Sequence, residues 1–140
     1  MSYQPAADET LSQFASLLFD RIFFQPDVAV AVSTWNQDVA EDAFVNINGN
    51  TIPAATFLEL VKGFHATGVG KLEKSTDLLV APKDPAGRTG TVAQSANIVV
   101  YHKDGKIVDQ ASVTIVQVEE KDGKRIMTSL VETTVETTRA

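Results

Sequence analysis

The chain has 140 residues, of which 44% are hydrophobic and 21% are charged, and its formal net charge is −6. This length predicts a single domain spanning residues 1–140, with enough apolar side chains for one core. No basic cluster exceeds Lys124-Arg125, so a nucleic-acid partner, which needs a positive face, is not expected. The absence of cysteine excludes disulfides, thiolate nucleophiles and thiolate metal ligands.

The first ten residues, MSYQPAADET, are polar, and they lack the basic-then-apolar pattern of a signal peptide. No apolar run approaches the roughly 20 residues of a membrane span. We therefore expect a soluble, cytoplasmic protein with no membrane partner.

Residues 11–24, LSQFASLLFDRIFF, repeat apolar side chains at helical spacing after the capping groups Asp8, Glu9 and Thr10. Pro26 ends this pattern and suits the first turn of a second helix over residues 27–40. That segment is rich in valine, so a strand is the alternative. The common face of Ala29, Val32, Trp35 and Val39 favours the helix.

Residues 44–52 are predicted to form a short two-stranded ribbon, because Asn48-Gly49 is a strong two-residue hairpin signal. Pro53 then suits the first turn of a third helix, which Gly68 and Gly70 end. The remaining sequence predicts four long strands at residues 72–82, 90–102, 106–120 and 124–137. Two Lys-Asp-Gly-Lys turns, at 103–106 and 121–124, predict that the last three strands form an antiparallel meander.

This order predicts an α+β domain in which three N-terminal helices pack on the concave face of a strongly curved, mostly antiparallel sheet. The short ribbon is expected at one edge of the sheet, where it directs the third helix back across the concavity. The result would be a cone with an internal pocket.

The segments LFDRIFFQPDVAVAVSTW and AEDAFVNINGNTIPAATFLELVKGF, with the terminal meander, resemble the nuclear transport factor 2-like superfamily and its SnoaL-like branch. The resemblance covers nearly the whole chain and implies the cone-shaped, cystatin-like α+β roll. It is architectural, and the superfamily includes enzymes, binding proteins and interaction domains.

The resemblance also allows specific activities to be compared position by position. Ile47 or Asn46 falls where ketosteroid isomerases have a general-base carboxylate, and Phe19 falls where they have a donor tyrosine. Their second carboxyl falls near Asn97 or Ile98. Ketosteroid isomerisation is therefore not expected, and the paired histidines of the related dehydratases are not matched by His65 and His102.

Three carboxylates interrupt otherwise apolar or neutral strands and are candidates for a general acid or base: Asp77, Asp109 and Glu132. Asp109 shares a strand face with Ala111 and Val113, although a position near the strand end would let it reach water. His65 is a further catalytic candidate at the pocket mouth, or else caps its helix. No histidine–carboxylate set has metal-ligand spacing, so neither a metal nor another cofactor is expected.

The expected pocket combines helical aromatic side chains with strand residues. Its predicted lining is Phe19, Phe23, Trp35, Asn46, Phe57, Val113 and Ile115. Such aromatic residues are more often core than ligand contacts. A buried Trp35 would give blue-shifted fluorescence emission.

Two classes of function follow from these observations. The first is a small-molecule pocket protein, either a lyase, isomerase or cyclase for an apolar metabolite or a non-catalytic binder. The second is an interaction or accessory dimerisation module. Residues 111–118 carry groups that tolerate burial on both strand faces, and helices cover only one, so we expect a homodimer through the outer sheet face.

Overall fold

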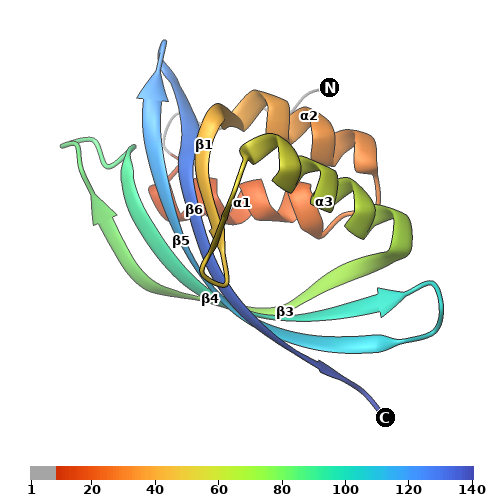
Figure 1. Ribbon diagram of the computed structural model, residues 1–140. Helices are drawn as coiled ribbons and strands as arrows, with labels where there is room; N and C mark the ends of the chain where they lie inside the picture. The colour runs from red at the N-terminus through yellow and green to blue at the C-terminus, as the bar shows by residue number, and fades with distance from the viewer. Residues whose placement is uncertain (1–8) are drawn as a thin grey trace.

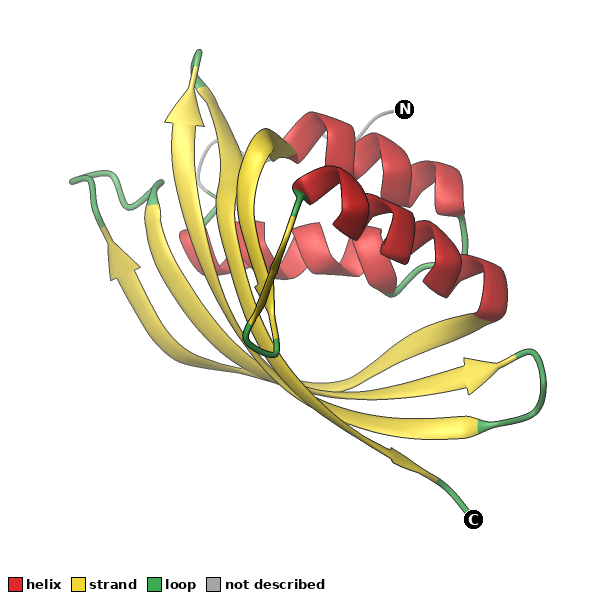
Figure 2. Ribbon diagram, in the orientation of Figure 1, coloured by secondary structure: helices red, strands yellow, loops and turns green. Residues whose placement is uncertain are grey.

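The computed structural model describes residues 9–140 as two layers, with three helices on one side of a six-stranded sheet (Figures 1 and 2). The helices are α1 (Leu11–Phe23), α2 (Val28–Asp38) and α3 (Ala54–Thr67). The strands are β1 (Val39–Ile47), β2 (Asn50–Ile52), β3 (Gly68–Pro82), β4 (Gly90–His102), β5 (Ile107–Lys121) and β6 (Lys124–Thr138). The α+β class and the chain order of the elements are thus confirmed.

Helix α1 begins with a reciprocal cap. Thr10 accepts a hydrogen bond from the Gln13 amide at 3.1 Å, and the Thr10 amide donates to Gln13 Oε1 at 2.8 Å. These bonds satisfy two of the amides that a helix start leaves without partners. Asp8, also expected to cap this helix, lies outside the described residues.

The valine-rich segment is helical, because Asp27 caps α2 by accepting from the Ala29 amide at 2.9 Å. The chain passes directly from Asp38 into β1 at Val39, five residues before the expected ribbon. Strand β1 pairs in parallel with β6, starting at Val39 and Met127, so the sheet is mixed although mostly antiparallel.

The short ribbon lies at a sheet edge, as expected. Asn48 and Gly49 have φ angles of 51° and 86°, the left-handed backbone that a two-residue hairpin turn needs. Strand β2 therefore forms one edge of the order β2-β1-β6-β5-β4-β3, and α3 follows it.

The strong curvature expected for the sheet is not confirmed. The sheet is open, with β2 and β3 as its edges. Strand β3 contains two irregularities in its pairing with β4, one between Leu72 and Lys74 and one between Asp77 and Leu79. Such bulges bend a strand locally.

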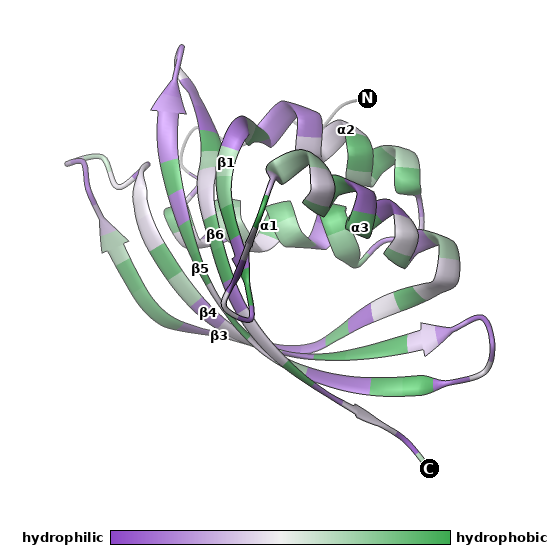
Figure 3. Ribbon diagram, viewed as in Figure 1, coloured by the Kyte–Doolittle hydropathy of each residue, from purple (hydrophilic) through white to green (hydrophobic). Residues whose placement is uncertain are grey.

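The core lies between the helices and the face of the sheet that they cover, here called the inner face; the other is the outer face. Figure 3 shows hydrophobic and hydrophilic residues in turn along the strands. The largest fully buried side chains are Phe14, Leu11, Leu18, Ile22, Met127 and Leu130. Within residues 9–140, no helix combines the length and apolar character needed to cross a membrane.

Candidate functional site

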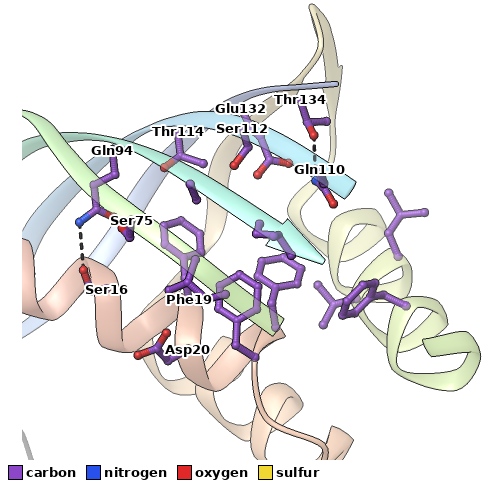
Figure 4. A pocket seen from close by; sticks show the side chains of 18 of the residues that line it. Ser16, Phe19, Asp20, Ser75, Gln94, Gln110, Ser112, Thr114, Glu132 and Thr134 are labelled. Carbon is purple, nitrogen blue, oxygen red and sulfur yellow. Dashed lines mark hydrogen bonds between the residues drawn. The ribbon is translucent and has the colours of Figure 1, made fainter. Parts of the chain in front are cut away.

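A cavity of about 380 Å³ lies between α1, α3 and the inner face of strands β3 to β6 (Figure 4). Its size falls in the range of small-molecule sites, which is roughly 300–1,000 Å³. The core fills the space under α1 toward one end of the sheet, and the cavity occupies the other end. Its two walls differ in chemistry.

The helical wall is mostly apolar and aromatic, and Ser16 and Asp20 of α1 are its polar residues. It is lined by Phe19, Phe23, Phe24, Phe57 and Phe64, with Leu60 and Val61. Phe23 holds these rings together, since its ring meets those of Phe57 and Phe64 edge-on at centroid distances of 6.1 Å and 5.9 Å. Edge-to-face pairs at these distances are favourable. The wall is therefore a packed surface of rings.

The sheet wall is mostly polar, although Leu72, Ala96 and Ile98 also line it from β3 and β4. Its main polar side chains come from pairing positions on adjacent strands. One row crosses the sheet from Gln94 to Thr114 to Glu132. The neighbouring row contains Ser112 and Thr134, which pair across β5 and β6. All five side chains line the cavity. Hydroxyl, amide and carboxyl groups thus face the aromatic rings (Figure 4).

Polarity begins where the core ends. The row next to Gln94, Thr114 and Glu132 on the other side is Val92, Val116 and Leu130, each about 1% exposed. Two hydrogen bonds order the polar wall: Gln94 Nε2 donates to Ser16 Oγ at 3.0 Å, and Gln110 Nε2 donates to Thr134 Oγ1 at 2.8 Å.

Glu132 is the distinctive group of this wall. Its carboxyl points from the sheet toward the aromatic wall (Figure 4). Burial raises the pKa of Glu132, because the charged form loses its hydration, and among residues 9–140 no cation or hydrogen-bond donor offsets the effect. Such a carboxyl can exchange a proton nearer to neutral pH than an ordinary glutamate.

A second carboxyl, Asp20, lines the cavity from α1. Burial raises the pKa of Asp20 also, and the positive charge of Arg21 opposes part of this rise. The two acidic groups therefore come from opposite layers of the protein.

The backbone around Glu132 is fixed by the hairpin. The Asn48 amide donates to the Glu132 carbonyl at 2.8 Å, and the Thr134 amide donates to Asn48 Oδ1 at 2.8 Å. The side chain of Asn48 thereby adds one more hydrogen bond to those that join β1 and β6. This contact holds Glu132 and Thr134 on the inner face.

The other catalytic candidates lie outside the cavity lining. Asp109 is half-exposed on the outer face and receives two 2.8 Å hydrogen bonds from Arg139, which hold the pKa of its carboxyl below the usual range. His65 Nε2 lies 2.7 Å from the Ile22 carbonyl oxygen and joins α3 to α1. Neither residue is among those that line the cavity, and a catalytic role for either stays a prediction.

Asp77 is exposed on β3 and has hydrogen bonds from Ser12 at 2.6 Å and Gln94 at 2.8 Å. These bonds lower the pKa of Asp77, so the carboxyl is a stable anion that holds α1 against the sheet. No group of three His, Cys, Asp or Glu side chains among the described residues is arranged to hold a metal ion.

The expected ligand pocket divides into two groups. Phe19, Phe23 and Phe57 line the cavity wall; that they contact a ligand stays a prediction. The others do not line it. Trp35 is buried in the core against Phe57, with ring centroids 5.2 Å apart, and Asn46 bonds within the hairpin to Thr51 and Gly49.

The predicted orientation of β5 is wrong. Val113 and Ile115 lie on the outer face, where each is 42% exposed, and Ser112 and Thr114 point inward. Val116 and Val118 continue the alternation of Ser112 and Thr114 and are 1% and 0% exposed. These two valines are the sequence signal for which face of β5 points inward.

No protein-family model and no curated protein matches the sequence, but solved structures share the fold. A conserved protein from Planctomyces limnophilus aligns with a TM-score of 0.63 at 15% identity, covering 89% of this chain and 91% of that one. The hexachlorocyclohexane dehydrochlorinase LinA type 2 aligns at 0.61 with 12% identity, covering 91% and 84%. An NTF2-like protein of unknown function from Prochlorococcus marinus aligns at 0.54 with 12% identity, covering 93% of each chain. The chain therefore has the nuclear transport factor 2-like fold.

Proposed function

We propose that this protein binds a small, mostly apolar molecule in the cavity and acts on it by proton transfer through Glu132. The observation that carries the proposal is a carboxyl group of raised pKa, without a partner among residues 9–140, that faces a wall of phenylalanine rings. Sites for small molecules combine a large apolar surface with few polar groups in this manner.

The chemistry of such a group is general acid–base catalysis. Protonated Glu132 would donate to an oxygen or a leaving group, and ionised Glu132 would remove a proton from carbon. The hydroxyls of Thr114 and Ser112 stand on the same wall and would orient the substrate's polar atoms. These roles suit a lyase, isomerase or cyclase that needs no cofactor. One solved structure of this fold is named a dehydrochlorinase, which supports an elimination reaction in such a scaffold.

Hydrogen–deuterium exchange tests the proton transfer without knowledge of the natural substrate. A panel of small apolar ketones is incubated with the protein in deuterium oxide, and exchange at the carbon next to the carbonyl is followed by NMR. We expect exchange above background for at least one ketone with the wild type, and background exchange with Glu132→Gln. Asp109→Asn, which removes a carboxyl from the outer face, is the control and should exchange like the wild type.

If Glu132→Gln exchanges as fast as the wild type, Glu132 is not the acid–base group. If no panel member exchanges but apolar dyes bind the cavity, proton transfer on ketones is wrong and the alternative of a non-catalytic binder is favoured.

A second proposal concerns assembly. On the outer face, Val113, Ile115 and Val135 are exposed apolar side chains on adjacent strands, and Ala111 pairs with Val135. We infer that a second copy of the chain covers this face, because an apolar patch across several strands is unfavourable in water.

A further inference from the structure

The charged groups that line the cavity are all acidic. Its 20 lining residues include Asp20 from α1 and Glu132 and Glu136 from β6, but no lysine, arginine or histidine. Helix α3 contributes only apolar side chains to the lining. The whole chain also carries a net charge of −6. Arg21 offsets part of the charge of Asp20, but no cationic side chain is among the residues that line the cavity.

The aromatic wall favours the same kind of ligand. The face of a phenylalanine ring is negative because of its quadrupole, so it attracts a cation that has lost part of its water. Five such rings line the cavity opposite the polar strands. Rings together with carboxylates are the chemistry by which proteins recognise ammonium groups.

The polar wall can also satisfy an ammonium group. A primary ammonium has three hydrogen-bond donors and no acceptor. Glu132 offers a carboxylate, Thr114 stands directly opposite it on β5, and Thr134 follows it on the same face of β6. Side chains opposite each other on paired strands lie about 5 Å apart, a spacing that one small group can bridge.

We propose that the ligand of this cavity is a protonated amine with an apolar, ring-containing body, whose nitrogen binds at Glu132 while its body lies against the phenylalanine wall. This inference rests on the proposed function of the cavity as a ligand site and adds the charge of the ligand. An isolated carboxylate is costly to bury, and a bound ammonium supplies the missing counter-charge. A carboxylate ligand would instead be repelled by all three acidic groups, which makes the site selective.

The test uses three probes that share one skeleton and differ in charge: 2-naphthylmethylamine, 2-naphthylmethanol and 2-naphthoate. Their affinities for the wild-type protein are measured by isothermal titration calorimetry at pH 7.5 and low salt. We expect the amine to bind at least about tenfold more tightly than the alcohol, and the carboxylate to bind too weakly to measure.

Two variants assign the selectivity to a residue. Glu132→Gln should bring the affinity for the amine down to that for the alcohol and leave the alcohol unchanged. Asp109→Asn should keep the wild-type order of affinities, since Asp109 lies on the outer face. The comparison of the three probes on the wild type holds even if the Glu132 variant fails to fold.

The outcomes separate this inference from the proposed function. If none of the three probes binds, the cavity is not a ligand site and both proposals fail. If the alcohol binds as tightly as the amine, the cavity is a ligand site but the preference for an amine is wrong. Selectivity for the amine that survives in Glu132→Gln would also overturn the inference, because another group would then hold the nitrogen.

Discussion

Replacement of Glu132 by glutamine should stabilise the protein at neutral pH. The pKa of Glu132 is higher in the folded chain than the ordinary value of 4.5. The folded state therefore binds the proton more tightly, and this residue's contribution to stability is complete below pH 4.5 and is lost as the pH rises through the folded pKa. Glutamine has nearly the same shape and no charge, so the variant avoids that loss.

The size of the gain follows from the surroundings of the carboxyl. Leaving a buried polar group without a partner costs about 1–3 kcal/mol, and leaving a charged group without one costs more. Because the Glu132 side chain faces a cavity and is only partly buried, we take the lower end, about 1 kcal/mol at pH 7. For a chain of this length that corresponds to a rise in Tm of about 3 °C.

Thermal unfolding followed by circular dichroism at pH 7 and pH 4 measures this effect. Dilute protein is needed at pH 4, because the sequence pI is about 4.8. The Tm difference between Glu132→Gln and the wild type should be positive at pH 7 and close to zero at pH 4. Asp109→Asn is a control for which the expected change in Tm has the opposite sign. Arg139 lowers the pKa of Asp109, so this variant should be less stable than the wild type at pH 7. If Glu132→Gln is less stable than the wild type at pH 7, the Glu132 carboxylate has a stabilising partner in the folded protein, and the reasoning is refuted.

Three further predictions concern the hairpin, the outer face and the tryptophan. Asn48→Gly should lose about 1 kcal/mol, because the turn keeps its left-handed backbone while the hydrogen bond from Thr134 is lost, whereas Asn48→Asp should keep the acceptor and unfold nearer to the wild type. Ile115→Lys should convert the proposed dimer into a 15 kDa species in sedimentation at micromolar concentration; a wild type that is already monomeric would disprove the dimer. Trp35 should fluoresce in the blue-shifted range of a buried indole, and emission typical of indole in water would contradict its core position.

Local signals in the sequence were sufficient for the order of the elements. Thr10 before α1, Asp27 before α2 and Asn48-Gly49 between two short strands each act through hydrogen bonds or backbone angles within a few residues. The start of β1 at Val39 was missed because it depends on a partner nearly 90 residues away, Met127. Pairing between distant strands leaves no mark on a short window of sequence.

The candidate site was only partly predictable for the same reason. Glu132 was recognisable as a carboxylate in a neutral strand, but Thr114 on β5 lies beside it, and Gln94 on β4 beside Thr114, only through the observed register. Asp109 had the same pattern in the sequence and lies on the opposite face. The difference depends on the phase of the strand, and a shift of one residue exchanges the two faces.

The side chains of β5 explain why the sequence did not indicate which residues point to the inner face. The inner face of β5 changes along the strand from Val116 and Val118, which are buried in the core, to Ser112 and Thr114, which line the cavity, while Val113 and Ile115 point to the outside. In the cavity half of the strand, the usual rule of apolar inside and polar outside is therefore reversed. Polar groups on the inside need hydrogen bonds from the protein, from water or from a ligand, and apolar groups on the outside are unfavourable unless another surface covers them. The reversed pattern is thus one observation that supports both the proposed ligand and the proposed second copy. The two are separable, since Ile115→Lys should abolish the dimer without altering the preference for the amine, and Glu132→Gln should do the opposite.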